Sequence, residues 1–171
     1  EDEYNRWIKN PDFVRISAYV KNQVAVERNL AAVEVYRLTK DKRWHNLYLA
    51  TLNAETPRSE AIFIYSRLDK SMVNPKAQRN AVDSLISKAD RLVEVSENNA
   101  FGITTSIPGK ALGGWESTYS IPASPTLVRA HYLTGNLKYL KTLLRSTLFS
   151  AGANPMNLVL TTGLGENCVQ H

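Results

Sequence analysis

The sequence predicts an all-α protein built from helical hairpins, and three observations support this prediction. Apolar residues recur every three or four positions through most of the 171 residues, which is the period of a helix. A strand-like pattern is confined to residues 158–160. The hairpin turn at 38–44 has a counterpart at 133–139, so pairs of helices recur along the chain.

The first half of the chain contains four expected helical stretches. Residues 13–38 keep a helical period and form one long helix or two helices end to end. Asp41 is expected to cap the next helix, which Pro57 ends. Residues 61–68 form a short stretch, and residues 75–97 form a longer one that opens with a proline. The inward-facing residues of the capped helix are expected to be Trp44, Leu47, Tyr48 and Leu52.

The second half begins with a change in composition. Residues 102–125 are rich in Gly, Ser, Thr and Pro, which predicts a long loop of the kind that commonly carries function. Helical period returns at 127–133, breaks at 134–136 and resumes through 140–148. After Gly152 the chain is expected to be irregular.

Composition and charge argue against several kinds of function and site. The 21 basic and 16 acidic residues give a net charge of +5, but mixtures of both signs such as residues 40–43 predict solvated helix faces rather than a nucleic-acid surface. No apolar run approaches the ~20 residues of a membrane span, and the first residues do not resemble a signal peptide. Cys168 is the single cysteine, so it predicts neither an internal disulfide nor, with three histidines, a zinc site.

The two matching turns have a local chemical explanation. Each joins a helix end that carries Thr to an Asp or Asn, with an aromatic residue starting the next helix. Asp41 and Asn136 are expected to accept hydrogen bonds from the exposed N–H groups of that helix, while Trp44 and Tyr139 pack back on the preceding one. This repetition favours stacked α-hairpins over a simple bundle.

The most specific pattern lies near the end of the chain. Residues 152–165 read Gly-Ala-Asn-Pro-Met-Asn-Leu-Val-Leu-Thr-Thr-Gly-Leu-Gly. This resembles a segment of glycoside hydrolase family 9, the cellulase family with an (α/α)6 toroid, in which leucine-glycine-x-asparagine-proline precedes threonine-glycine-x-glycine. Ala151 stands in place of the leucine, residues 114–117 look like that family's tryptophan-glycine-serine segment, and residues 31–44 are similar to an earlier hairpin. The resemblance covers nearly the whole chain in order.

The resemblance implies a fold and a chemistry. Residues 1–171 would form a single partial (α/α)6 catalytic domain, incomplete at both ends. The family implies inverting hydrolysis of β-linked glucans or related oligosaccharides, with an aspartate base that activates water and a glutamate acid that protonates the leaving oxygen. Neither carboxylate has a matching position here, so no catalytic residue is assigned. The expected partners are therefore the saccharide and the remainder of the domain, with no nucleic acid and no membrane.

Five residues are assigned to sugar binding. Trp115 and Tyr119 lie in the glycine-rich loop and suit stacking on a pyranose face, although Trp115 could instead anchor its own loop. Asn154 and Thr162 lie in the C-terminal segment, whose proline and glycines let the backbone pass close to a ligand. His171 falls beside the family's substrate-contacting histidine. No cofactor is assigned, although the resemblance is compatible with calcium, and it implies a secreted or periplasmic protein.

Two other functions stay open. The chain could be a non-catalytic helical-repeat module that binds protein through a concave face. It could also belong to another (α/α)6 carbohydrate-active enzyme, a lyase or an epimerase, for which no catalytic Tyr, His or Arg set is recognisable. The two Gly/Pro-rich segments, 102–125 and 152–171, favour the hydrolase because a scaffold has no need of them.

Overall fold

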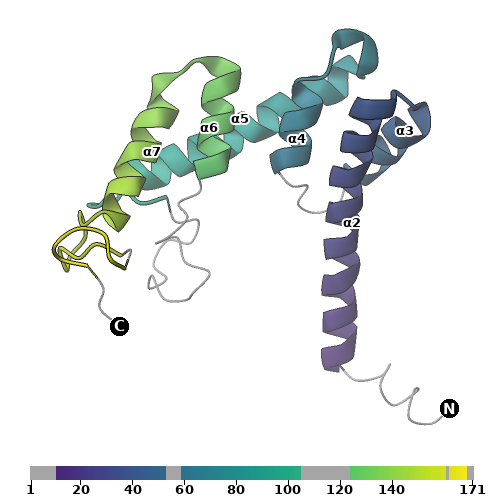
Figure 1. Cartoon of the computed structure of the whole chain (residues 1–171). Helices are drawn as coiled ribbons and strands as arrows, with labels where there is room; N and C mark the ends of the chain where they lie inside the picture. Colours follow the sequence, from purple (N-terminus) through teal and green to yellow (C-terminus); the bar gives the residue numbers. More distant parts are fainter. Residues whose placement is uncertain (1–10, 53–58, 105–123, 161, 169–171) are drawn as a thin grey trace. The chain divides into compact units, whose positions relative to one another are not determined.

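A computed structural model describes residues 11–52, 59–104, 124–160 and 162–168, with the backbone alone for 11–23 and 124 (Figure 1). The structure is all-α, as predicted. Its helices are α2 (Pro11–Thr39), α3 (Lys42–Thr51), α4 (Ser59–Ser66), the short 3-10 helix η1 (Lys70–Met72), α5 (Pro75–Glu97), α6 (Ser124–Thr134) and α7 (Leu137–Ser150). Across these described ranges, β-pairing is limited to isolated bridges at Val159.

The chain divides into two compact units, residues 1–81 and 82–171, and the boundary falls within α5. The expectation of a single partial domain stays a prediction. A search of the described helices found none that is long and apolar enough to cross a membrane.

In the first unit, α2 packs against α3 and α4. Val33, Tyr48 and Ile62 are fully buried between them. The buried side chain of Asn29 donates hydrogen bonds to the Tyr48 carbonyl at 3.1 Å and to Thr51 Oγ1 at 3.0 Å. Since each of these bonds leaves α2 and ends on α3, Asn29 fixes the two helices to one another in the middle of an apolar contact.

An aromatic stack, formed by Tyr36, His45, Tyr48 and Tyr65, completes this core. The His45 ring lies parallel to Tyr36, with 4.7 Å between ring centroids, and its Nε2 lies 2.9 Å from the Tyr65 hydroxyl. That hydroxyl also accepts the Asn74 N–H at 2.9 Å. Burial lowers the pKa of His45. Burial also raises the pKa of Tyr48.

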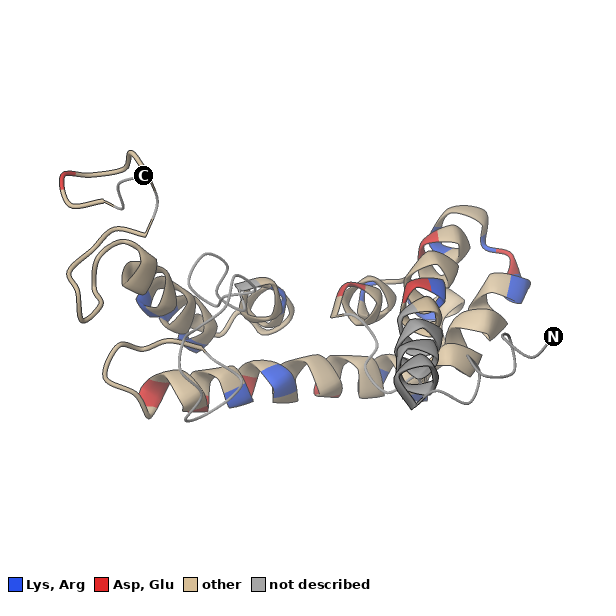
Figure 2. Cartoon of the chain, turned by 90° about the horizontal axis from the view of Figure 1, so that it is seen from below, with Lys and Arg blue, Asp and Glu red and all other residues tan. Residues whose placement is uncertain are grey.

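In the second unit, α6 and α7 form a hairpin, and α7 is tied to α5. The Tyr139 hydroxyl donates to Asp90 at 2.8 Å, and Lys138 Nζ lies 2.7 Å from the same carboxylate oxygen. The hydrogen bond from Lys138 lowers the pKa of Asp90 and that from Tyr139 adds to it. Basic and acidic residues are mixed along α5 (Figure 2), which is the mixture of charge that the sequence predicts.

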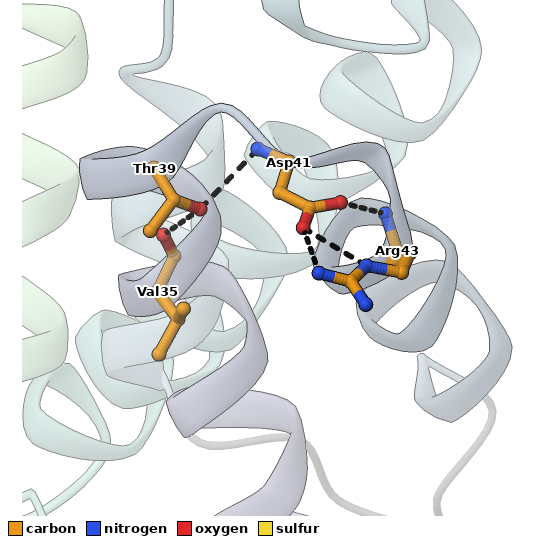
Figure 3. A network of polar contacts seen from close by, with 4 residues as sticks. All are labelled: Val35, Thr39, Asp41 and Arg43. Atoms are coloured by element: carbon orange, nitrogen blue, oxygen red, sulfur yellow. Dashed lines mark hydrogen bonds and ion pairs between the residues drawn. The ribbon is translucent and has the colours of Figure 1, made fainter.

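The two predicted turns have the same geometry, which confirms the sequence match. In the first, Thr39 Oγ1 donates to the Val35 carbonyl and accepts the Asp41 N–H, while Asp41 Oδ1 accepts the Arg43 N–H at 2.9 Å (Figure 3). The second turn repeats each bond. Thr134 Oγ1 donates to the Ala130 carbonyl and accepts the Asn136 N–H, while Asn136 Oδ1 accepts the Lys138 N–H at 3.0 Å. Tyr139 is buried and its counterpart Trp44 is half-buried, and their packing on the preceding helix stays a prediction.

The helical period locates the helices but does not identify their buried faces. Among the side chains described in α2, those of residues 24–39, the periodic residues Val24 and Leu38 are exposed, and the buried set is Val26, Asn29, Ala32, Val33 and Tyr36. In α3 only Tyr48 of the expected inward-facing residues is buried, and the others are half-buried. A helix with apolar residues on more than one face leaves the choice of face to its neighbours, which periodicity alone does not show.

Candidate functional site

The candidate site is built from two loop segments that meet at the C-terminal end of α7. The first follows α5. Asn99 donates to the Val95 carbonyl at 2.6 Å and to the Ile103 carbonyl at 2.8 Å, and it accepts the Ile103 N–H at 3.0 Å. The buried Ser96 hydroxyl donates to the Gly102 carbonyl at 2.6 Å. These bonds fold the chain back at once after the helix ends.

This turn packs directly on α7. Thr104, the last described residue before 105, is buried with its hydroxyl 3.2 Å from that of Ser146. Phe101 meets Phe149 edge to face, with 5.9 Å between centroids. Gly102 has a φ of +66°, a conformation that favours glycine, and a Cβ there would lie 3.0 Å from Arg145 Nε, so the Arg145 side chain would have to shift to admit it. The segment that carries Trp115 and Tyr119 therefore starts beside the last two turns of α7.

The second segment leaves the end of α7 and is organised by Asn154. Its amide nitrogen donates to the carbonyls of Phe149 at 2.8 Å and Leu158 at 2.7 Å. Its oxygen accepts the N–H groups of Met156 and Leu158, both at 3.2 Å. Both amide hydrogens and both lone pairs are thus engaged within the loop, and the residue is buried. Asn154 shapes this loop, and its direct contact with sugar stays a prediction.

Val159 lies at the centre of the same loop. It bridges to Ala151 in antiparallel and to Cys168 in parallel fashion, and its N–H donates to the Asn167 carbonyl at 2.8 Å. Gly163 and Gly165 have φ values of +73° and +75°, which confirms that glycine is needed to turn the backbone here. A Cβ on Gly165 would lie 3.4 Å from the Val159 side chain, which is ordinary van der Waals contact, so the backbone conformation alone favours glycine there.

The structure describes two of the five predicted sugar-binding residues. Asn154 lies at the base of the loop and Thr162 is exposed in it. Trp115, Tyr119 and His171 lie outside the described residues. The structure brings together the start of the predicted loop 102–125 and the base of the segment 152–171, both at the C-terminal end of α7.

Sequence reasoning missed the residues that hold the first segment, namely Ser96, Asn99, Thr104 and Ser146. The helix end at 98–102 was recognisable, but nothing in the sequence alone links Thr104 to a residue 42 positions later. The Asn99 turn had a readable signal. An Asn at the end of a helix, followed three residues later by Gly, is typical of a chain reversal held by the Asn side chain.

The calcium expectation finds no support in the described part of the chain. There, no group of three or more His, Cys, Asp or Glu side chains lies close enough together to hold a metal ion. Calcium stays a prediction, and no role is derived for a metal.

Comparison with known proteins identifies a similar fold. A metagenome-derived glycoside hydrolase family 9 endoglucanase of known structure matches with a TM-score of 0.70 and 22% identity, over 84% of this chain. This chain spans only 28% of the length of that one. No family model matches the sequence, and no curated protein matches it. The likeness therefore concerns the fold, and the chain has a helical scaffold like that of the endoglucanase.

Proposed function

We propose that this chain is part of a glycoside hydrolase that acts on β-linked glucans or related oligosaccharides, and that it supplies scaffold and sugar-binding loops. The observation that carries the proposal is the convergence of two loop segments at the end of α7, in a fold like that of a family 9 endoglucanase. Binding sites for small ligands are commonly built from loops that a rigid scaffold holds together. Buried hydrogen bonds hold the bases of both loops here, at Thr104 and at Asn154.

The proposed chemistry is hydrolysis with inversion. A carboxylate base removes a proton from water as the water attacks the anomeric carbon, and a carboxylic acid protonates the departing oxygen. We assign neither group to this chain and propose that the remainder of the domain supplies both. The role proposed for this chain is to orient the saccharide through Trp115 and Tyr119, with Thr162 and His171 as polar contacts and Asn154 holding the loop.

The expectations on partners, cofactor and location are also part of this proposal. We propose a saccharide and the remainder of the catalytic domain as partners, with neither nucleic acid nor membrane, no cofactor, and a secreted or periplasmic location. A lyase, an epimerase or a protein-binding repeat module would be an alternative outcome of the experiment below.

Intrinsic tryptophan fluorescence during titration with cello-oligosaccharides or chito-oligosaccharides tests the proposal on the full chain. Stacking of a pyranose on Trp115 is expected to quench its emission, and Trp115→Ala is expected to abolish the response. Trp44→Phe is the matched control, because half-buried Trp44 lies in the first turn of α3 and should not sense the sugar. No response to either oligosaccharide, or a response lost equally in Trp44→Phe, would contradict the proposal.

A further inference from the structure

Helix α7 exposes its most apolar face. Its buried side chains are Tyr139, Thr142, Ser146 and Phe149, two of which carry hydroxyls on short side chains. Leu137, Leu144 and Leu148 are 60%, 64% and 56% exposed. These three residues are called the leucine stripe below.

The leucine stripe lies opposite the buried face. At about 100° per residue, positions 137, 144 and 148 fall within about 40° of one another and about 160° from the centre of the buried set. A helix at the surface of a monomeric protein normally carries charged or polar residues on that side. Three neighbouring leucines that are more than half exposed therefore indicate a face that another apolar surface covers.

The charges of α7 indicate what kind of surface this is. The helix contains three basic residues and no acidic one. Lys141 and Arg145 project along one border of the leucine stripe, and Lys138 lies beyond them, paired with Asp90. The other border consists of Leu140, Leu143 and Thr147. The stripe is thus basic on one side only.

We propose that the leucine stripe is the docking surface for an amphipathic helix whose apolar face carries Asp or Glu along one edge. Leucines pack into the apolar face of such a helix, and its acidic edge meets Lys141 and Arg145. A membrane surface would favour basic residues on both borders, which α7 does not have. The choice of partner, a helix from the remainder of the hydrolase domain, rests on the proposed function. The endoglucanase with the same fold has most of its length outside the part matched by this chain.

Peptide binding to the full chain tests this proposal. The probes are two designed helical peptides of about 18 residues with the same leucine face, one bordered by Glu and the other by Lys. Fluorescence anisotropy is expected to show micromolar binding of the Glu peptide and at least about tenfold weaker binding of the Lys peptide. The variant with both Leu144→Gln and Leu148→Gln should weaken binding of the Glu peptide at least about tenfold. Leu38→Gln, at a more exposed leucine of α2, should leave it unchanged.

A charge variant keeps the test independent of folding defects. Lys141→Glu is expected to weaken binding of the Glu peptide and to strengthen binding of the Lys peptide. Loss of structure would not produce this reversal. Equal binding of both peptides, or full binding by the double leucine variant, would overturn the proposal. So would leucine-dependent dimers of the free chain in sedimentation, or leucine-dependent binding to vesicles of phosphatidylcholine with phosphatidylserine.

The sugar experiment separates this inference from the proposed function. If the Glu peptide binds as expected but no oligosaccharide alters Trp115 emission, the docking surface stands and the hydrolase proposal fails. If the oligosaccharide binds and the leucine variants take up the Glu peptide as the unmodified chain does, the hydrolase proposal stands and the docking surface fails.

Discussion

The α2–α3 and α6–α7 hairpins use the same turn with different residues at two of its positions. Thr39 and Thr134 close the preceding helix in both, and an Asp or Asn caps the following one. At the left-handed position between them, the first turn has Lys40 with a φ of 59° and the second has Gly135 with a φ of 69°. The cap is ionised Asp41 in one turn and neutral Asn136 in the other.

The difference shows which part of the turn is essential to its shape. The Thr hydroxyl and the Asp or Asn side chain satisfy the backbone groups at both helix ends, so they fix the turn. The left-handed residue only has to tolerate its conformation, which a lysine does at an energetic cost. The α6–α7 hairpin then continues into the Asn154 loop, and the sugar contact proposed for Thr162 lies in that loop rather than at the turn.

The largest expected effect concerns that loop. Asn154→Ala removes four hydrogen bonds and leaves the carbonyls of Phe149 and Leu158 without their donor, so it is expected to destabilise the loop by about 2–4 kcal/mol. Amide hydrogen exchange at Leu158 measures this directly. Asn98→Ala is the matched control, because the exposed Asn98 makes one bond to the Glu94 carbonyl. Equal protection of Leu158 in both variants would contradict the role given to Asn154.

Removing the caps tests whether the two turns are equivalent. Asp41→Ala and Asn136→Ala should each cost about 1 kcal/mol, since each leaves an N–H at the start of a helix without its acceptor. The ion pair of Asp41 with Arg43 adds little, because the Arg43 side chain is almost fully exposed. Exchange of the Arg43 and Lys138 amides reports each turn separately. A cost confined to one turn would show that the shared hydrogen bonds do not have a shared effect.

Exchanging the left-handed residues should change stability in opposite directions. Lys40→Gly is expected to stabilise by about 0.5 kcal/mol, because relief of backbone strain exceeds the entropy that glycine gains in the unfolded chain. Gly135→Ala is expected to destabilise by about 1 kcal/mol. A Cβ at Gly135 meets nothing within 4 Å, so the cost comes from the backbone alone. Denaturant unfolding measures both, and changes of the same sign would refute the strain argument.

The turns also show what sequence can and cannot predict here. The caps are local, so Asp41 and Asn136 at matching positions predicted them correctly, and the helices followed from periodicity. The buried faces of α2 and α7 were not predictable, because Leu38, Leu144 and Leu148 are as apolar as core residues. The candidate site depends on Thr104 meeting Ser146, a non-local pairing that only the fold creates. Its expected aromatic contacts, Trp115 and Tyr119, remain predictions.

A smaller effect should follow from the aromatic stack of the first hairpin. Burial lowers the pKa of His45 below its ordinary value of 6.5. Between the lowered pKa and pH 6.5, the unfolded chain therefore binds more protons than the folded chain. The contribution of neutral His45 to the free energy of unfolding is therefore fully present above pH 6.5, and it decreases as the pH falls toward the folded-state pKa. His45→Phe keeps the ring between Tyr36 and Tyr65 and should remove this pH dependence. Titration of the His45 ring by NMR would contradict the assignment if its midpoint lies at or above 6.5.

The smallest expected effect separates the two caps by their charge. Hydrogen bonds from the Arg43 side chain and from its backbone N–H lower the pKa of Asp41 below its ordinary value of 3.8. The first turn is therefore stabilised above pH 3.8 and loses that contribution as pH falls through the lowered pKa, whereas the cap of Asn136 does not titrate. Asp41→Asn should make the first turn as insensitive to acid as the second, and Asn136→Asp should transfer the sensitivity. Carboxyl chemical shifts of Asp41 during acid titration measure it, and a midpoint at or above 3.8 would mean that Arg43 does not stabilise the ionised cap.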